Sequence, residues 1–271
     1  MPCSSPRRCR PKPAHPPASA GAAAARDWAS LPRDVLSAIF LRLGPCREIM
    51  RGAEFACAAW RRAAVEDPGL WRRVDIDVFV LAAAGLRKGW RAMLRAAVDR
   101  GAGRCEHFSG PCDEELLLYL VERANSLKSL HLLCLHVPNE VLNAAVKKYP
   151  HLEDLELKFV RFPSDNMLIS VCQACPRLKK LNLYFSQCSD DGQLVLEIIK
   201  GGIPMMSELL SLELFLCDLT NEGLTSILDN CPLLESLYIT GSFDYYGMDE
   251  ELQAKCSRVK NLTLPIYSIN G

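Results

Sequence analysis

The cysteines, through their thiol groups, are the residues of this sequence that could carry out chemistry. The 271-residue chain contains 13 cysteines, and Cys172 and Cys175 form a CxxC pair, a spacing used by zinc sites. A structural zinc ion needs four ligands, usually from a second such pair or from two histidines at metal spacing. The other cysteines are scattered, and the 5 histidines are not clustered. The pattern favours cysteines that pack as small buried hydrophobic residues, and we expect no metal and no cofactor.

A thiol enzyme is an alternative that the cysteines leave open. A nucleophilic thiol needs a base beside it, and no cysteine has an evident one, although distance along the sequence does not decide this. Loss of activity on alkylation, with partner binding intact, would support such an enzyme. The number of cysteines is odd and the N-terminus has no apolar signal segment. We therefore expect reduced thiols and a location in the nucleus, the cytoplasm or both.

Charge divides the chain into two segments. Residues 1–104 hold 19 Lys and Arg against 9 Asp and Glu, whereas residues 105–271 hold 13 against 23. This asymmetry indicates two segments with different roles. A nucleic-acid binder that uses the basic segment is a second alternative, and a steep salt dependence of binding would be its signature. We expect neither a nucleic acid nor a membrane as partner, because no run approaches the ~18 to 20 apolar residues of a membrane helix and much basic charge lies on predicted helices.

Residues 1–26 are rich in Pro, Ala and Arg and are predicted to be a disordered basic tail. Three readings of its basic cluster stay open: a nuclear address, a solvated tail, or a weak likeness to an organelle transit peptide. The cluster consists of Arg7, Arg8, Arg10 and Lys12.

The elements that would position any site follow a leucine repeat. The stretch LLSLELFLCDL at 209–219 matches the template L-x-x-L-x-L-x-x-[N/C]-x-L at every fixed position. Related copies begin at Leu127, Leu152, Leu178, Leu234 and Val259, with a degenerate copy at Cys105. Intervals of 22 to 31 residues between the copies are typical of stacked strand and helix units. The repeat predicts an α/β fold, a short solenoid with a curved parallel sheet and outer helices.

Within each repeat, the strand leucines are expected to point inward and the chain to continue into a helix. In the opening copy, Leu212 and Leu214 lie on the strand, while Leu209 and Cys217 flank it. The predicted helices include 113–125, 139–150 and 220–232. Side chains that could accept the N-cap hydrogen bonds are Asn139, Ser164, Ser189 and Thr220.

The residues between the inward leucines are predicted to form three rows on the concave face. These rows are Asp154, Lys180, Ser211 and Ser236; Glu156, Asn182, Glu213 and Tyr238; and Lys158, Tyr184, Phe215 and Thr240. Tyr184, Phe215 and Tyr238 are aromatic residues among charges, as at the centre of many interfaces. They are either a binding surface for a protein client with a basic or mixed patch, or scattered aromatics on an ordinary exposed sheet.

Residues 28–75 predict three short helices. Leu31, Val35, Leu36, Ile39, Phe40 and Leu43 recur at helical spacing. Ser30 is a possible cap with Pro32 in the first turn, and Gly44-Pro45 ends this helix. A second helix would carry Ile49, Phe55, Cys57 and Trp60, and a short third element would hold Leu70 and Trp71. So short a segment cannot bury this much apolar surface by itself, which predicts a partner.

Two resemblances follow from these motifs. The Cys-Pro pairs at 175–176 and 231–232, with Cys188 and Cys217 after strands, resemble the cysteine-containing class of leucine-rich repeats over residues 105–265. The stretch LPRDVLSAIFLRL, followed by Cys57, WR at 60–61 and LW at 70–71, resembles the F-box. The combination is similar to F-box/leucine-rich-repeat proteins, most of all the plant SKIP-type members.

The resemblance implies a non-catalytic, client-recruiting subunit of a Skp–cullin–F-box ubiquitin ligase. The F-box would dock on a Skp-type adaptor and, through it, on cullin and RING proteins, while the repeats bind the client protein. The residues expected to meet the adaptor are Trp28, Leu31, Pro32, Val35, Leu36, Ile39 and Leu43. Trp60 and Trp71 would mainly hold the three helices together, with part of their surface at the interface. An F-box scaffold that acts outside a ubiquitin ligase remains an alternative.

The expected domains are the tail at 1–26, the F-box at 27–75, a linker helix region at 76–104 and about six leucine-rich repeats at 105–271. The linker is expected to be a helix over 86–101, with Gly101 at its C-terminal cap, that joins the F-box rigidly to the first repeat.

Overall fold

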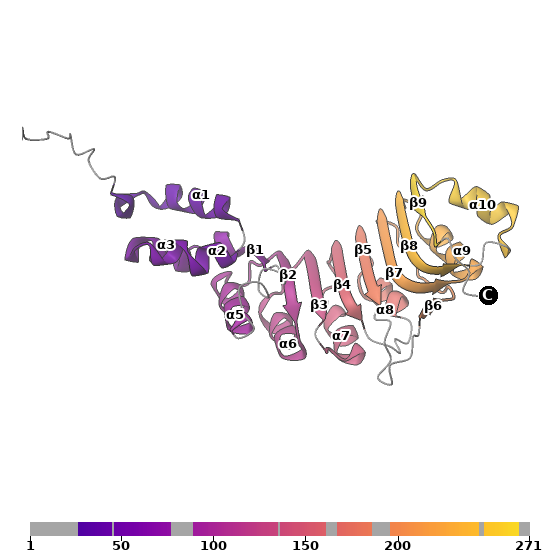
Figure 1. Ribbon diagram of the computed structural model, residues 1–271, viewed down its shortest axis with the longest axis horizontal. Coiled ribbons are helices and arrows are strands. Elements are labelled where there is room, and N and C mark those ends of the chain that lie inside the picture. Colours follow the sequence, from indigo (N-terminus) through magenta and orange to yellow (C-terminus); the bar gives the residue numbers. More distant parts are fainter. Residues whose placement is uncertain are drawn as a thin grey trace, which may run out of the picture.

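The structure is a computed structural model that describes residues 27–44, 46–76, 89–134, 136–160, 167–185, 196–243 and 247–265. The expected disordered tail and the expected caps Ser164 and Ser189 lie outside the described residues. A small helical layer at the N-terminal end is followed by a curved sheet with helices along its outer side (Figure 1). The predicted α/β class and curved parallel sheet are confirmed. Within the described residues, no helix has the length and apolar character needed to cross a membrane.

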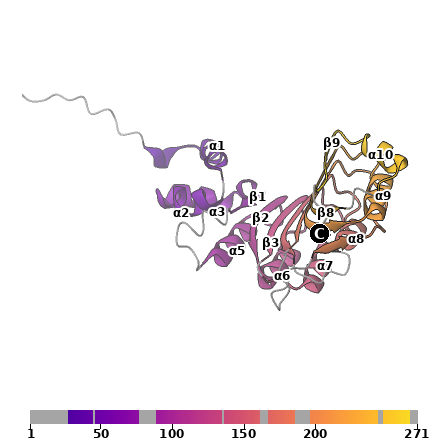
Figure 2. The ribbon, with the colours of Figure 1, turned by 45° about the vertical axis from the view of Figure 1, so that its right-hand side comes forward.

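Nine strands form one sheet, in the order β1-β2-β3-β4-β5-β7-β8-β9, with β6 paired to β7 beside this path. All of these pairs are parallel. The strands are β1 (Arg73–Asp75), β2 (His107–Cys112), β3 (Ser129–Cys134), β4 (Asp154–Val160), β5 (Lys180–Phe185), β6 (Glu197–Ile199), β7 (Ser211–Leu219), β8 (Ser236–Phe243) and β9 (Asn261–Thr263). The helices α5 (Trp90–Arg100), α6 (Glu114–Arg123), α7 (Asn139–Val146), α8 (Met167–Ala174), α9 (Asn221–Asn230) and α10 (Glu250–Cys256) connect them. Figure 2, turned by 45°, shows that the sheet bends along its length.

Leucines of each repeat fill the space between the sheet and the helices. Leu209, Leu212 and Leu214 are buried, and so is Cys217. The inward set expected from the repeat is therefore confirmed, although Cys217 lies within β7 and not beside it. Leucines of neighbouring strands stand in register, as Leu181 and Leu212 do.

Backbone hydrogen bonds repeat at the start of each strand. The carbonyl of Lys179, for example, accepts the N–H groups of Leu210 and Ser211 at 2.9 and 3.0 Å. The same pattern begins at Arg72, directly before β1. The sheet therefore starts inside the segment 27–75 that was expected to be F-box alone. A three-residue strand without a leucine signature gives no period by which it could be found.

Capping residues fix the helix starts on the outer side. Thr220 accepts a hydrogen bond from the N–H of Gly223 at 3.0 Å, which confirms its predicted role. Asp113 caps α6 in the same way, although the sequence had not singled it out. The prediction for Asn139 is wrong, because Pro138 is the N-cap of α7 and Asn139 is the first helical residue.

The longest repeat interval, from Leu178 to Leu209, contains a strand in its described part. β6 pairs with the second half of β7, where Glu197 stands opposite Cys217. No helix lies in residues 196–209 of the described structure. The expectation of a helix between successive strands is therefore not met in that part of this repeat.

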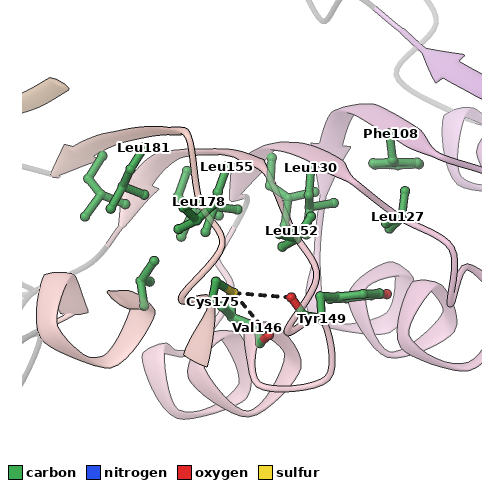
Figure 3. Packing of buried hydrophobic residues seen from close by; sticks show 14 of the residues in the cluster. Phe108, Leu127, Leu130, Val146, Tyr149, Leu152, Leu155, Cys175, Leu178 and Leu181 are labelled. Carbon is green, nitrogen blue, oxygen red and sulfur yellow. Dashed lines mark hydrogen bonds between the residues drawn. The ribbon is translucent and has the colours of Figure 1, made fainter. Parts of the chain in front are cut away.

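A buried cysteine forms hydrogen bonds with the end of the preceding helical segment. The Cys175 thiol donates to the backbone carbonyls of Tyr149 at 3.3 Å and Val146 at 3.8 Å (Figure 3). Both carbonyls also accept a backbone N–H group, that of Tyr149 from Leu152 at 3.1 Å and that of Val146 from Tyr149 at 3.0 Å, so the thiol is an additional donor at this helix end. This contact gives a packing role to the cysteine of the predicted CxxC pair.

The N-terminal segment forms a small helical domain whose first helix starts later than predicted. Its elements are η1 (Trp28–Ser30), α1 (Arg33–Leu43), α2 (Cys46–Arg51), η2 (Ala53–Phe55), α3 (Ala58–Glu66) and η3 (Pro68–Trp71). The N-cap of α1 is Pro32 and Ser30 belongs to η1, so the expected cap and the place of Pro32 in the first turn are wrong. The predicted stop is confirmed, because Gly44 follows α1 with a φ of 84°.

The second predicted helix is interrupted. The chain leaves the helix at Gly52 and is extended at Cys57, where φ is −164°. Ile49, Phe55 and Trp60, which were predicted to lie on one helix, therefore come from three elements. Apolar spacing alone did not reveal the break, because the apolar residues on either side keep nearly helical spacing.

The two elements that lead into the sheet agree with expectation. Leu70 and Trp71 lie in η3, the expected short third element. The linker helix is α5, with its apolar face buried and Gly101 at its C-cap; residues 86–88 of the predicted helix 86–101 lie outside the described part.

Candidate functional site

Helix α1 carries one buried and one accessible apolar stripe. Leu36 and Phe40 point into the core of the helical domain. Val35 and Leu43 are exposed, and Ile39 between them is half-buried. These two stripes are adjacent, because residues four apart lie one above the other on a helix. The domain therefore packs with one side of α1 and presents apolar side chains on the next.

Trp60 of α3 holds the segment in front of α1 in place. Its indole Nε1 donates to the carbonyl of Trp28 at 2.8 Å, and its ring meets Phe40 edge-on at 5.6 Å between centroids. The indole of Trp28 itself is 55% exposed. The accessible apolar surface thus continues from α1 onto the preceding segment.

On the concave side of the sheet, the strand register confirms two of the three predicted rows. They are Asp154, Lys180, Ser211 and Ser236, and Glu156, Asn182, Glu213 and Tyr238. In the third row, Lys158, Tyr184 and Phe215 stand opposite one another. This row breaks before Thr240, because the register of β7 and β8 shifts after Leu214.

The three predicted aromatic residues of this face lie in contact. Tyr184 and Phe215 are stacked with 4.0 Å between centroids and 4° between planes. Phe215 also meets Tyr238 at 5.3 Å and 42°. The Nζ of Lys158 lies 5.2 Å from the centroid of Tyr184. We call Tyr184, Phe215 and Tyr238 the aromatic cluster; they are one continuous group rather than scattered rings.

A bulge in β7 places the central ring of the aromatic cluster. Leu216 has a φ of 63°, a left-handed conformation that costs a branched side chain about 1 to 2 kcal/mol. Its N–H donates to Oγ1 of Thr240 at 3.1 Å. On β8, Gly241 has a φ of 130°, and a Cβ there would lie 1.8 Å from the carbonyl oxygen of Cys217. Strained positions cluster at functional sites, which favours a role for this part of the face.

A polar network lies on β2, β3 and β4, further along the same face. Nε2 of His131 is 3.0 Å from Oδ2 of Asp154 and 3.3 Å from Oγ of Ser129. The same hydroxyl is 2.8 Å from Nδ1 of His107. A Ser–His–acid relay needs the serine and the acid at opposite nitrogens of the ring. Here both contact Nε2, so the arrangement is a structural network and not a relay.

The polar network predicts a pH-dependent contribution to stability. Burial alone would lower the pKa of His131, but the hydrogen bond to Asp154 and the charges of Asp154 and Glu156 raise it. The stabilisation is therefore complete below an unfolded-state pKa near 6.5 and is lost as the pH rises through the raised pKa. We expect His131→Gln to destabilise the protein more at about pH 6 than at about pH 9 in urea unfolding.

The control for this prediction must account for the other histidine of the polar network. His107, whose pKa is lowered by burial and by Arg73, is present in both proteins and contributes with the opposite sign. His131 itself contributes to the lowered pKa of His107, so comparing the variant with the unsubstituted protein at each pH measures the removal of His131 together with its effect on His107. An equal loss of stability at both pH values would contradict the pairing with Asp154.

The buried cysteines of the repeats are poor candidates for a reactive site. Burial raises the pKa of Cys105, Cys134, Cys175, Cys217 and Cys231 to about 12. The pKa of Cys172 is also raised by burial. Such thiols stay protonated at neutral pH and are poor nucleophiles. Among the described residues, no cluster of His, Cys, Asp or Glu could hold a metal ion.

Comparison with known proteins places the chain in a family. An F-box-like family model matches residues 28–77. Putative F-box/LRR-repeat protein 23 of Arabidopsis thaliana is 36% identical over 252 residues, which are 89% of this chain and 54% of that protein. Putative F-box/LRR-repeat protein 22 of the same plant is 32% identical, with 90% of this chain and 82% of that protein covered. The chain belongs to the F-box/LRR-repeat family. F-box protein SKIP19, also from Arabidopsis, is 33% identical and is covered over 82% of its length. This chain spans about half the length of the first of these relatives.

Most of the predicted adaptor-binding residues of this F-box/LRR-repeat chain reach the surface. They are Trp28, Leu31, Pro32, Val35, Ile39, Leu43 and Trp60, and we call them the α1 surface. Leu36 is buried and does not reach the surface. Trp71 is also buried, so it holds the helices together as expected but offers no part of its surface to a partner. Trp71 donates from Nε1 to the carbonyl of Ala64 at 2.8 Å and holds α3 against η3. These two residues therefore stabilise the F-box and present no surface to a partner.

Three exposed apolar residues of the F-box were missed as candidates for contact. Leu41 on α1 is 64% exposed, Phe55 in η2 is 68% exposed and Val65 on α3 is 43% exposed. Phe55 had been predicted to lie on a continuous second helix, and the break at Gly52 places it in η2 instead. A contiguous exposed apolar patch commonly marks an interaction site, whereas single exposed residues do not.

A buried ion pair joins the F-box to the repeats. Nη1 of Arg100, in the last turn of α5, is 2.8 Å from Oε2 of Glu54 in η2, and the two side chains are 17% and 7% exposed. The guanidinium also lies 4.9 Å from the ring centroid of Trp71. Together with the pairing of β1 and β2, these contacts fix the α1 surface relative to the concave face.

Proposed function

We propose that this chain is the client-recruiting subunit of a Skp–cullin–F-box ubiquitin ligase. In this role the F-box docks on a Skp-type adaptor, which connects it to cullin and RING proteins, and the concave face of the repeats binds a client protein. The chain performs no chemistry of its own. Its family membership and the protonated state of its buried thiols both support a non-catalytic role.

The α1 surface is the observation that carries the proposal. It places Trp28, Val35 and Leu43, all exposed, on one side of a domain that matches the F-box-like family. An exposed apolar patch of this kind is costly in water unless a partner covers it. Because the core of the domain is filled by other side chains, these residues are available for a partner.

The ion pair between Glu54 and Arg100 supports the second half of the proposal, that the F-box and the client surface work as one rigid unit. A ligase of this kind acts by proximity, since a client lysine must stay within reach of a ubiquitin thioester carried by the other subunits. A rigid junction keeps that distance nearly constant, whereas a flexible linker would let the client lysine spend less time near the thioester.

The adaptor complex tests the proposal. We expect the double substitution Leu31→Ala and Pro32→Ala to abolish co-purification of a Skp-type adaptor, because each lost anchor at an interface centre commonly costs about 2 kcal/mol or more. The measurement is recovery of the adaptor with the tagged full chain, together with circular dichroism to show that the repeats stay folded.

A matched control comes from the repeats. Pro232 and Leu233 form an exposed Pro-Leu pair in the turn after α9, far from the F-box in the fold. Replacing both by Ala makes the same two changes of residue type and should leave adaptor recovery unchanged. Unchanged recovery with the Leu31 and Pro32 variant would refute the assignment of the α1 surface.

An F-box scaffold outside a ubiquitin ligase is the second candidate. Such a scaffold would bind the adaptor but would not co-purify with a cullin, so the same purification distinguishes the two. We propose the nucleus or the cytoplasm as the location, since the 13 cysteines would stay reduced there.

A further inference from the structure

One carboxylate beside the aromatic cluster has no cation. On the concave face, Asp154 is 3.0 Å from Nε2 of His131, and Glu156 is 2.6 Å from Nζ of Lys158. Glu213, in the same row as Glu156, makes no ion pair or hydrogen bond with any residue that the structure describes. It is half-buried and stands directly opposite Tyr238. A carboxylate in this position attracts a cation from outside the chain.

Another strand of the same sheet, β4, which is separated from β7 by β5, shows how such a cation would be bound. On β4, Lys158 follows Glu156 by two residues, pairs with it and lies over the ring of Tyr184. On β7, the residue two after Glu213 is Phe215. The two strands therefore carry the same acid in register, but β7 has a ring where β4 has an ammonium group. The β7 position provides the acid without a cation of its own. Tyr184 stacks on one face of Phe215, whereas Tyr238 stands opposite Glu213 and is partly exposed, so Tyr238 is the ring best placed to meet such a cation.

The rings next to Glu213 are suited to a flat cation. Phe215 and Tyr238 are 5.3 Å apart with 42° between their planes, and Tyr238 is 38% exposed, so a face of it is reachable. The negative potential extends to these rings: the pKa of Tyr184 is raised by burial and then by the charges of Glu156 and Glu213. An anionic ligand is disfavoured by the same charges.

We propose that Glu213, Phe215 and Tyr238 bind the guanidinium group of an arginine side chain in the client protein. Arginine fits better than lysine because its planar group stacks on aromatic faces and pairs with a carboxylate through two parallel hydrogen bonds. The inference deepens the proposed function, since it names the chemistry by which the concave face selects a client. An extended client segment across β5, β7 and β8 would place this arginine at the centre of the aromatic cluster.

Selection from a displayed library of random 12-residue peptides on the purified full chain tests this inference. We expect the selected peptides to share an arginine at one position. Replacing it by citrulline, which keeps the shape and removes the charge, should weaken binding about tenfold or more, and replacement by lysine should weaken it less. A library that yields no binders, or binders without a shared cationic residue, would overturn the inference.

Variants of the protein locate the binding position. Glu213→Gln and Tyr238→Ala should each weaken a selected peptide about tenfold or more, while Tyr238→Phe, which keeps the ring, should change its affinity less than about threefold. The matched control is Glu235→Gln, because this glutamate precedes β8 but is already paired with Lys260 at 2.8 Å. If Glu213→Gln binds as tightly as the unsubstituted chain, arginine recognition at this position is refuted.

The experiment separates this inference from the proposed function. Peptide selection uses the chain alone and does not require the adaptor, whereas co-purification of the adaptor does not require a client. Arginine-dependent binding without adaptor binding would preserve the inference and refute the ligase role. Adaptor binding together with peptide binding that does not depend on arginine would refute the inference and preserve the ligase role.

Discussion

Leu212→Ala is expected to lower the free energy of unfolding by about 2 to 5 kcal/mol. Leu212 is 1% exposed near the start of β7, between the leucines of β5 and β8 that stand in register with it. Truncation removes buried apolar surface and leaves a cavity that a stacked repeat cannot close, because the strand positions on both sides are fixed by the backbone ladder. Leu181→Ala, one strand earlier, should cost a similar amount. Urea unfolding followed by circular dichroism measures both.

The adjacent residue is the control for this prediction. Glu213→Ala should change the free energy of unfolding by less than about 0.5 kcal/mol, since its side chain has no partner among the described residues and faces the concave side. If Glu213 proved as costly as Leu212, the inward and outward assignment of β7 would be wrong. The same variant leaves the fold available for the peptide-binding measurements.

Arg100→Met is expected to destabilise the protein by about 3 to 5 kcal/mol, because it leaves the Glu54 carboxylate buried without its partner. The loss should be concentrated at the junction between the F-box and the repeats. Limited proteolysis of the variant should therefore cut between the two parts faster than in the unsubstituted protein, in addition to a lower midpoint in urea.

Two further variants test the physical reason. Arg95, one turn earlier on α5, also pairs with a glutamate, Glu115, and stacks on a ring, but that glutamate is 65% exposed. Arg95→Met should cost less than about 1 kcal/mol, as for other surface ion pairs. Replacing Glu54 by Leu together with Arg100→Met should cost less than Arg100→Met alone, because no buried charge then remains unpaired. A double variant as unstable as the single one would show that packing of the arginine stem, and not charge, holds the junction.

Most of the solenoid could be predicted because its signal is local and repeated. The spacing of Leu209, Leu212 and Leu214 recurs in six copies, and each copy places its leucines inward for the same steric reason. Parallel strands stacked in register then bring Tyr184 and Phe215 to neighbouring positions, so the aromatic row followed from the repeat alone. The end of α1 at Gly44 could also be predicted, because the Gly44-Pro45 pair that signals it lies at that point of the sequence.

Other features depend on contacts between distant parts of the chain and could be seen only in the folded structure. The burial of Leu36 and Trp71, the exposure of Phe55 and the membership of β1 in the sheet each depend on which elements pack together. The pairing of Glu54 with Arg100 spans 46 residues, and no local period indicates it.

The binding chemistry of the concave face was also predictable in part from the sequence and in part only from the folded structure. Alternation of side chains along a strand already places Glu213 and the aromatic residues on one side of the sheet. The folded chain shows in addition that Glu156 pairs with Lys158 while Glu213 has no partner among the described residues, and that Phe215 contacts both Tyr184 and Tyr238. Alternation is a property of each strand, whereas side-chain conformations and the spacing of neighbouring strands decide which charges pair and which rings touch, and these are set only when the chain folds.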